Sequence, residues 1–351
     1  MRGQGQSHRQ SASATLQEVA RAAGVSLATA SRAFNGSATR TVRPDLRERV
    51  LAAAAELNYT PNANAQAMAR GTTNLVGLVV HDIADPFFAA IAAGVMRAAD
   101  EHGLIVTMGS TQREPLREVE YVAALRQQRA RVLILAGSRL VDSEIFERLG
   151  AEVSAFQAIG GQVAAISQPK LPVNTVVVGN RAGAAKLAET LHGLGYRRFA
   201  VLAGPSTLLT ARDRLAGFRA GLAKHGCVVP GDRVVPGEFT RDGGYAAMSE
   251  LLHRGTDVTC VFAVNDVMAV GAMAALRDHG LRLPDEMAVA GFDDIVTLRD
   301  VTPGLTTVRV PLEDLGASAL RLALEPPAEK PRLQRVRGVV VVRESTPDRT
   351  R

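Results

Sequence analysis

One short stretch of the sequence carries side chains that could read the edge of a nucleic-acid base. It runs from Gly24 to Gly36 (GVSLATASRAFNG), and its single charged side chain is Arg32. An arginine on a helix can donate two parallel hydrogen bonds to O6 and N7 of a guanine in the major groove. A lone helical arginine is more commonly a solvated surface residue, so the surrounding elements decide between the two interpretations.

Helical spacing divides this stretch into two faces. The packing face holds small and apolar side chains, namely Val25, Ala30, Ala33 and Phe34. The outward face holds the side chains that can touch a partner, namely Leu27, Ala28, Ser31, Arg32 and Asn35. Such a division predicts a helix that packs on one side and presents a nearly neutral surface on the other.

The preceding residues predict the helix that would position this stretch. Thr15-Leu16-Gln17-Glu18 has the spacing of a capping box, so we expect a first helix from there to about Ala22. Gly24 supplies a sharp turn, Val25 can fill the space between the helices, and Ser26 can cap the next helix. Two short helices joined by a glycine turn are typical of a helix-turn-helix.

A third helix is expected from Pro44 to Leu57. Proline suits the first turn of a helix, and Leu46, Val50 and Leu57 form its expected apolar face. Residues 1–70 contain nine arginines and four carboxylates, which gives them +5 of the chain's net charge of +6. A basic head on a nearly neutral body favours nucleic acid as the partner of the head, because no amphipathic membrane anchor is evident.

The remaining 281 residues have the pattern of parallel α/β structure. Short apolar runs alternate with amphipathic segments such as 87–102 and 212–225, which predicts βαβ units with helices on both faces of each sheet. The expected strands are 75–80, 104–108, 132–136, 163–166, 175–178, 199–203, 258–264 and 287–291. This length exceeds a single sheet, so we expect two subdomains that separate near Ser167–Pro172 and share a ligand cleft.

The sequence lacks the residue patterns of several enzyme classes. His81 and Asp82 are adjacent, but neighbours in an extended segment point apart, so their spacing gives no acid/base pair. No G-x-S-x-G elbow, phosphate loop or G-x-G-x-x-G after the first strand is present. Cys227 and Cys260 are isolated, so neither a metal site nor a disulfide framework is expected, and no cofactor is implied.

Three segments in this order resemble the lactose/galactose repressor (LacI/GalR) family of bacterial transcription regulators. They are LQEVARAAGVSLATASRAFNG, RERVLAAAAELNYTPNANAQAMARG and NLVGLVVHDIADPFF, and the resemblance extends from Thr15 to about Ser345. It implies a helix-turn-helix head at 15–61, a hinge helix and linker at 62–73, and a periplasmic-binding-protein-like body at 74–345. Residues 1–14 would be a disordered arm and 346–351 a tail, with lobe crossings near 167–172, 292–296 and 307–311.

The resemblance assigns roles to residues of the head and hinge. Leu27 and Ala28 occupy the variable base-reading positions, and Arg32 matches the arginine that commonly reads guanine. The other expected DNA contacts are Ser26, Thr29, Ser31, Asn35, Tyr59 and Asn62, while Met68 would be the wedge that kinks the operator in the minor groove. Arg43 replaces the family's serine before the third helix, and Gln66 its hinge arginine.

For the body, the resemblance implies an effector pocket. Asp85, Phe87 and Phe88 match the pocket loop after the first strand, and Arg214 in RDRLAGF matches an arginine that grips effector hydroxyls or carboxylates. Aromatic rings suit the apolar C–H faces of a sugar, and a forked guanidinium suits its paired hydroxyls.

The opposite wall of that pocket is implied in the same way. Phe239 matches an aromatic that stacks on the ligand, Asn265 in AVNDVMAVGAM a polar contact, and Asp293 in GFDD an acceptor for hydroxyls.

The pocket also departs from the family pattern. Ser167-Gln168 stand where many sugar-binding members have an Asp-Arg pair, and Gly179 replaces a common aspartate. We therefore expect an unusual, small or phosphorylated effector, with Arg309 at a pocket-facing crossover offsetting the lost charge.

The function implied is that of a cytoplasmic homodimeric repressor of carbohydrate uptake or utilisation genes, without catalytic activity. It would bind near-palindromic operator DNA and a small sugar or sugar derivative, with no membrane partner. Two alternatives remain: a regulator whose effector site has decayed and which responds to a protein partner, and a solute-binding protein. The basic head and an N-terminus unlike a signal peptide disfavour the solute-binding protein.

Overall fold

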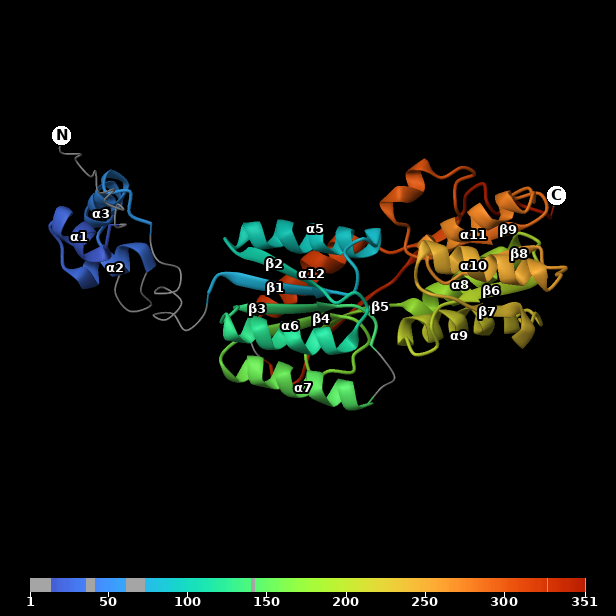
Figure 1. Ribbon diagram of the computed structural model, residues 1–351, viewed down its shortest axis with the longest axis horizontal. Helices are drawn as coiled ribbons and strands as arrows, with labels where there is room; N and C mark the ends of the chain where they lie inside the picture. Colours follow the sequence, from blue (N-terminus) through green and yellow to red (C-terminus); the bar gives the residue numbers. More distant parts are fainter. Residues whose placement is uncertain (1–13, 36–41, 61–72, 140–142, 327, 351) are drawn as a thin grey trace, which may run out of the picture. The chain divides into compact units, whose positions relative to one another are not determined.

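The computed structural model describes residues 14–35, 42–60, 73–139, 143–326 and 328–350 (Figure 1). The chain divides between Thr73 and Asn74 into two compact units, the head and the body. Each of them has its own hydrophobic core. Among the described residues, no helix is long and apolar enough to cross a membrane.

The head is a bundle of three helices, α1 (Leu16–Ala22), α2 (Leu27–Asn35) and α3 (Pro44–Glu56). The predicted capping box is confirmed, because the Glu18 amide donates to Thr15 Oγ1 and the Thr15 amide donates to Glu18 Oε2. Ser26 Oγ accepts the Thr29 amide at 3.1 Å and so caps α2, as predicted.

The core of the head consists mainly of alanine and valine side chains from all three helices. These are Val19, Ala20, Ala23, Ala30, Ala33, Val50, Ala53 and Ala54. The prediction that Leu57 belongs to the inner face of α3 is wrong, since this side chain follows the last helical residue and is 39% exposed. Small side chains let the three short helices approach closely, so Ala53 and Ala54 take the inner positions with Val50.

The first lobe of the body is built on a six-stranded parallel sheet with the order β11-β5-β4-β3-β1-β2. Its strands are β1 (Leu75–Val80), β2 (Ile105–Ser110), β3 (Val132–Ala136), β4 (Gln162–Ile166), β5 (Asn174–Val178) and β11 (Leu333–Val336). Helices α5 (Pro86–Glu101) and α12 (Leu312–Leu324) cover one face, and α6 (Pro115–Gln127) and α7 (Ser143–Ala158) cover the other (Figure 1).

The second lobe repeats this architecture with a four-stranded parallel sheet of order β7-β6-β8-β9. Its strands are β6 (Phe199–Ala203), β7 (Val234–Pro236), β8 (Cys260–Ala263) and β9 (Ala288–Ala290). Helices α8 (Asn180–Gly193) and α9 (Leu209–Ala223) form one layer, and α10 (Arg241–His253) and α11 (Asp266–Asp278) form the other (Figure 1). A separate antiparallel pair joins β10 (Thr307–Arg309) to β12 (Val339–Val341).

The predicted first crossing between the lobes is wrong in position. Residues 167–173 connect β4 to β5, which pair within the same sheet, so the chain leaves the first lobe only at Gly179, the N-cap of α8. It returns between β10 and α12, within the predicted range 307–311. The other predicted range, 292–296, lies beside this return, since the Asp293 amide donates to the Val308 carbonyl.

A third crossing follows β11, and the chain then ends on the second lobe. Thr346, predicted to begin a tail, is fully buried and its hydroxyl bonds with that of Thr306 at 2.7 Å. Arg349 stacks its guanidinium on the Tyr196 ring. Thr346, Pro347 and Arg349 therefore contact the second lobe.

Candidate functional site

The outward face of α2 is the candidate nucleic-acid interface of the head. Leu27 is 50% exposed, and Ala28 and Ser26 are exposed beside it, whereas Ala30 and Ala33 are buried, as the helical spacing predicts. Arg32 is half-buried and its Nε donates to the Ala28 carbonyl at 3.0 Å. This bond directs the guanidinium along the exposed face of the helix.

Other residues predicted to touch DNA differ in their placement. Thr29 and Ser31 are half-buried on α2. The Tyr59 ring lies 5.6 Å from that of Phe34 in the head core, and burial raises the pKa of its hydroxyl. Asn62 and Met68 lie outside the described residues, as does the side chain of Asn35.

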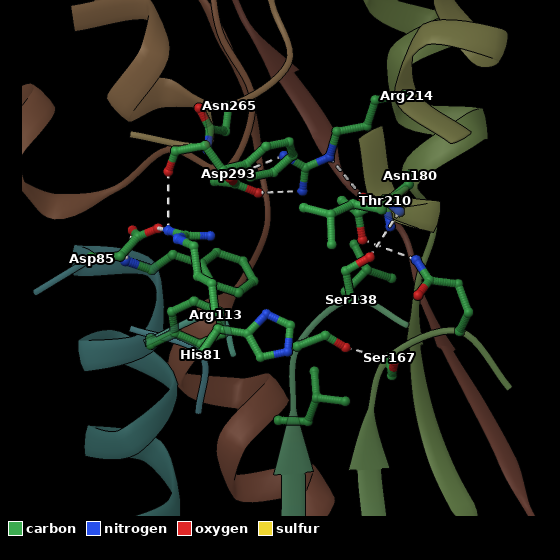
Figure 2. A pocket seen from close by; sticks show the side chains of 18 residues that line it. His81, Asp85, Arg113, Ser138, Ser167, Asn180, Thr210, Arg214, Asn265 and Asp293 are labelled. Carbon is green, nitrogen blue, oxygen red and sulfur yellow. Dashed lines mark hydrogen bonds and ion pairs between the residues drawn. The ribbon is translucent and has the colours of Figure 1, made fainter. Parts of the chain in front are cut away.

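A cavity between the two lobes is the second candidate site (Figure 2). Nine of the ten residues predicted for the effector line it: Asp85, Phe87, Phe88, Ser167, Gln168, Arg214, Phe239, Asn265 and Asp293. The other lining residues were not predicted from the sequence; they are His81, Arg113, Gly137, Ser138, Ile166, Val178, Asn180, Leu208 and Thr210. Most of these residues follow strands of the first sheet or begin helices of the second lobe. Ligands of open α/β sheets bind beside the carboxyl ends of the strands, so this position in the chain could have identified them.

Arg214 and Asp293 form a forked ion pair at the second-lobe wall (Figure 2). Nη2 and Nη1 of Arg214 donate to the two carboxylate oxygens at 2.6 and 3.1 Å, and both side chains are almost fully buried. Arg214 also donates to Asn180 Oδ1 and to the Val264 carbonyl, and its guanidinium stacks on the Phe292 ring. Four of its five N–H groups thereby hold a fixed geometry.

The loop after β9 presents Asp293 to the cavity. Its backbone has φ of +120°, and the amide donates to the Val308 carbonyl. Burial raises the pKa of Asp293 to about 6, while the Arg214 guanidinium opposes that rise. A carboxylate held this way, with its charge partner beside it, can accept hydrogen bonds from paired hydroxyls.

The first lobe contributes Asp85 and Arg113 to the facing wall. Asp85 caps α5 by accepting the Phe87 amide at 3.0 Å, and burial raises the pKa of its carboxyl. Arg113, on the connection that follows β2, extends its Nη2 to 3.5 Å from Asp85 Oδ2 and donates to the Phe239 carbonyl of the second lobe at 3.0 Å. Figure 2 shows this arginine between the lobes.

The opposite edge of the cavity is also bonded across the lobes. The Thr210 amide donates to Ser138 Oγ at 3.0 Å, and Gln168 Nε2 donates to Thr210 Oγ1 at 2.9 Å. The Ser167 hydroxyl is held within the first lobe, since it donates to the Gly137 carbonyl at 2.6 Å and accepts from Arg139 Nε at 3.0 Å. Hydrogen bonds of Arg113 on one side and of Thr210 on the other join the two lobes, so the cleft is closed in this structure.

Aromatic rings supply the apolar walls. Phe87 and Phe88 meet edge to face with centroids 5.0 Å apart, and Phe88 is the more deeply buried of the two. Phe239 fits against Gly204, where a Cβ atom would collide with its ring. His81 lies near Phe88, and burial lowers the pKa of its imidazole to about 4, so it is neutral at physiological pH.

The prediction that Arg309 faces the pocket is wrong. Its side chain is 57% exposed and its Nε donates to Asp294 Oδ2 at 2.6 Å, outside the cavity. Thr307 and Val308 are buried, and Arg309, at the exposed end of β10, extends outward to Asp294. Within the described ranges, no group of three or more His, Cys, Asp or Glu side chains is arranged to hold a metal ion.

The head and the body each match a known protein family. Residues 15–62 match the model of bacterial regulatory proteins of the lacI family, and residues 188–346 match a periplasmic binding protein-like domain. The regulators GalS of Salmonella typhimurium and GalR of Escherichia coli are each 36% identical to the chain, over 89% of it and 89% and 88% of their own lengths.

Solved structures give the same result. A complex of the transcriptional regulator CelR with cellobiose matches with a TM-score of 0.70 at 32% identity. The Lac repressor dimer bound to operator and the anti-inducer ONPF matches with a TM-score of 0.81 at 28% identity. Both matches cover 95% of this chain and 99% of the other. The chain is a helix-turn-helix transcriptional regulator and belongs to the lacI family of bacterial regulatory proteins.

Proposed function

We propose that the protein is a homodimeric repressor of carbohydrate uptake or utilisation genes, controlled by a small neutral sugar in the cavity between its lobes. Two heads would bind the half-sites of a near-palindromic operator, with the outward face of α2 in the major groove. The site of action is then the cytoplasm, where the DNA lies, and no catalytic step is involved. The similarity to the operator-bound Lac repressor dimer supports this assembly.

The observation that carries the sugar assignment is the buried Arg214–Asp293 fork within a wall of aromatic rings. Sugars present adjacent hydroxyls to such a fork and apolar C–H faces to rings such as Phe88 and Phe239. The similar CelR structure holds cellobiose, which supports a carbohydrate.

The charges of the cavity favour an uncharged ligand. Arg113 and Arg214 are offset by Asp85 and Asp293, and His81 is neutral because burial lowers its pKa to about 4. A phosphorylated effector, which the sequence also suggested, would add two negative charges to a balanced site. This chain lacks the Asp-Arg pair of many family members, and Gln168 and Ser138 instead form hydrogen bonds to Thr210 across the cleft.

Control would follow from closure of the cleft. A ligand that contacts both lobes favours the closed state by its differential affinity for closed and open forms. Closure would change the spacing of the two heads of a dimer and hence the affinity for the operator. The DNA-binding assay distinguishes the two directions of this coupling, since an inducer lowers operator affinity and a co-repressor raises it.

The test combines ligand screening with DNA binding. The full chain is screened by thermal shift against neutral sugars, sugar phosphates and nucleosides, and each hit is added to a fluorescence-anisotropy titration with operator selected from random DNA. We expect a neutral sugar to raise the melting temperature and to change operator affinity. Arg214→Ala should abolish both responses, whereas the exposed control Arg309→Ala should retain them.

Two results would contradict the proposal. A hit restricted to phosphates would overturn the neutral effector. No hit from any class, with operator binding intact, would instead favour the decayed sensor that responds to a protein partner.

A further inference from the structure

Two pairs of histidine rings lie at the ends of helices in the second lobe, and none of the four lines the cavity between the lobes. His253 and His279 meet edge to face, with ring centroids 5.5 Å apart and ring planes at 84°. His192 and His225 are stacked instead, with centroids 4.3 Å apart and planes at 12°. Nothing in the proposed function uses either pair.

The edge-to-face pair joins the carboxyl ends of two neighbouring helices. His253 is the last residue of α10 and His279 is the C-cap of α11, and both are exposed. The two helices pack against each other in one layer of the second lobe (Figure 1). The carbonyl end of a helix carries a partial negative charge, so two such ends side by side favour a cation beside these rings.

Each ring of this pair is held in one tautomer by its own helix. Nδ1 of His253 lies 2.7 Å from the Ser249 carbonyl oxygen, and Nδ1 of His279 lies 2.8 Å from that of Ala275. Because a carbonyl oxygen can only accept, Nδ1 donates in both neutral rings and the free lone pair is on Nε2. Histidines that bind metal ions have this arrangement, in which the other ring nitrogen donates to a backbone carbonyl or a carboxylate.

The spacing of the two rings fits a shared metal ion. A transition metal lies about 2.1 Å from a ligating imidazole nitrogen, so two rings on a tetrahedral ion have centroids about 5 Å apart. The 5.5 Å between His253 and His279 agrees with this geometry. The pair formed by His192 and His225 does not, because the lone pairs lie in the ring planes and two stacked, nearly parallel rings direct them to different points.

The arginines that adjoin the two histidines in the chain have carboxylate partners. Arg254 Nε lies 2.9 Å from Glu250 Oε1, and Arg277 Nε lies 3.4 Å from Asp278 Oδ1. These partners offset the positive charges, so the arginines do not oppose a bound cation with their full charge.

We propose that His253 and His279 form a binding site for a divalent transition-metal ion of the Zn²⁺, Ni²⁺ and Cu²⁺ class. Nε2 of each ring is a ligand, and water occupies the other positions of the ion. Within the described ranges, no third His, Cys, Asp or Glu side chain joins them. Imidazole nitrogen prefers these ions to hard cations such as Mg²⁺.

The ion stabilises the second lobe by joining the ends of α10 and α11. Asn265, which lines the cavity, caps the opposite end of α11. The site is therefore separate from the effector cavity, and its primary effect is on stability.

The first test measures metal binding to the full chain, prepared without an affinity tag. Isothermal titration is run with ZnCl₂ and NiCl₂, and with MgCl₂ as the hard cation. We expect Zn²⁺ to bind, and His253→Gln and His279→Gln each to lower the affinity by about tenfold or more, because each removes one of two ligands. The double variant His192→Gln/His225→Gln is the matched control and should bind Zn²⁺ as the wild type does.

The second test measures the stability that the ion supplies. Zn²⁺ at about 100 times its dissociation constant should raise the melting temperature of the wild type and of the control by about 4 °C. The same concentration should leave His253→Gln and His279→Gln nearly unchanged. Melting in the presence of EDTA verifies that each variant is folded, which we expect because both rings are exposed.

Four results would overturn the proposal. They are no Zn²⁺ binding by the full chain, Zn²⁺ binding that both single variants retain, loss of binding in the control variant alone, and equal affinities for Mg²⁺ and Zn²⁺. The third result would place the ion at His192 and His225, and the fourth would indicate attraction by charge without imidazole ligands. The proposed effector site stands or falls independently of all four, because neither pair lines the cavity.

Discussion

The head and the body place their functional groups in opposite ways. In the head, the candidate base-reading residues Leu27, Ala28 and Arg32 lie on the outward face of α2, and the core behind them consists of other side chains. In the body, Arg214 and Asp293 belong to the candidate site and are also buried parts of the fold. A substitution on the outward face of α2 should therefore change binding alone, whereas one in the cavity should change both binding and stability.

The largest expected effect tests this coupling in the body. Asp293→Ala leaves the Arg214 guanidinium buried without its carboxylate, and we expect the free energy of unfolding of the body to fall by about 3 to 5 kcal/mol. Urea unfolding of the full chain measures it, with the exposed Asp100→Ala as a control. The double variant Arg214→Met/Asp293→Asn keeps at 293 a residue that tolerates a positive φ and should recover part of the loss, and equal instability of the single and double variants would show that the unpaired charge is not the cause.

The corresponding change in the head should leave stability unaltered. Arg32→Ala removes a guanidinium from the exposed face of α2, so we expect operator binding to weaken by about 1 to 3 kcal/mol and base preference to relax. Fluorescence anisotropy at one fixed salt concentration measures both quantities, and Arg21→Ala on α1 is the matched control. Unchanged base preference would mean that α2 does not read the operator through Arg32.

The pH dependence of stability should also distinguish the two regions. Burial raises the pKa of Asp266 from its ordinary value of 3.8 to about 7, so the folded body binds this proton more tightly than the unfolded chain. Between pH 4 and 7 the free energy of unfolding should therefore fall as pH rises, by up to about 1.4 kcal/mol per pH unit, and level off above pH 7.

Asp266→Asn isolates this contribution, because the amide does not titrate. Subtracting the variant profile from the wild-type profile cancels the contribution of His81 to the pH dependence. That contribution has the opposite sign, because burial lowers the pKa of His81 and its protonation destabilises the folded state as pH falls. Parallel profiles from pH 4 to 8 would refute a raised pKa at Asp266.

The smallest expected effect is a gain in the head. Arg43 is the N-cap of α3 and makes no side-chain capping bond, although it pairs with Asp45 on the surface. Arg43→Ser should stabilise α3 by about 0.5 to 1 kcal/mol, since its hydroxyl can accept a first-turn amide. Hydrogen exchange of the α3 amides in the full chain measures the gain. Arg43→Ala lacks both the cap and the ion pair, so it should be less stable than Arg43→Ser.

The sequence predicted local features of the fold well. The capping box at Thr15, the Ser26 cap and the start of α3 at Pro44 depend on neighbouring residues, and the structure confirms all three. Strands β1, β3 and β6 coincide with the expected runs because buried parallel strands are continuously apolar. Strands β7, β10, β11 and β12 were missed, since runs of three or four residues are too short to give such a signal.

Long-range features were predicted less completely. The position of the first crossing depends on β5 pairing with β4, which no local pattern encodes. Arg113 and Thr210 enter the cavity because closure of the lobes brings them there, and neither stands in a motif that the sequence analysis used. Arg309 was misplaced for the same reason, because it pairs with Asp294, which the return of β10 past the loop after β9 places beside it.

The order of the crossings has a consequence for synthesis of the chain on the ribosome. The core of the head is complete once Tyr59 has emerged, but the first lobe receives its edge strand from residues 333–336 and the second is closed by Ser345 and Thr346. A stop codon from 291 to 332 therefore leaves a whole head on two unfinished lobes with open strand edges, which are prone to aggregation. The codons for residues 333–346 thus decide whether a head is made together with two completed lobes.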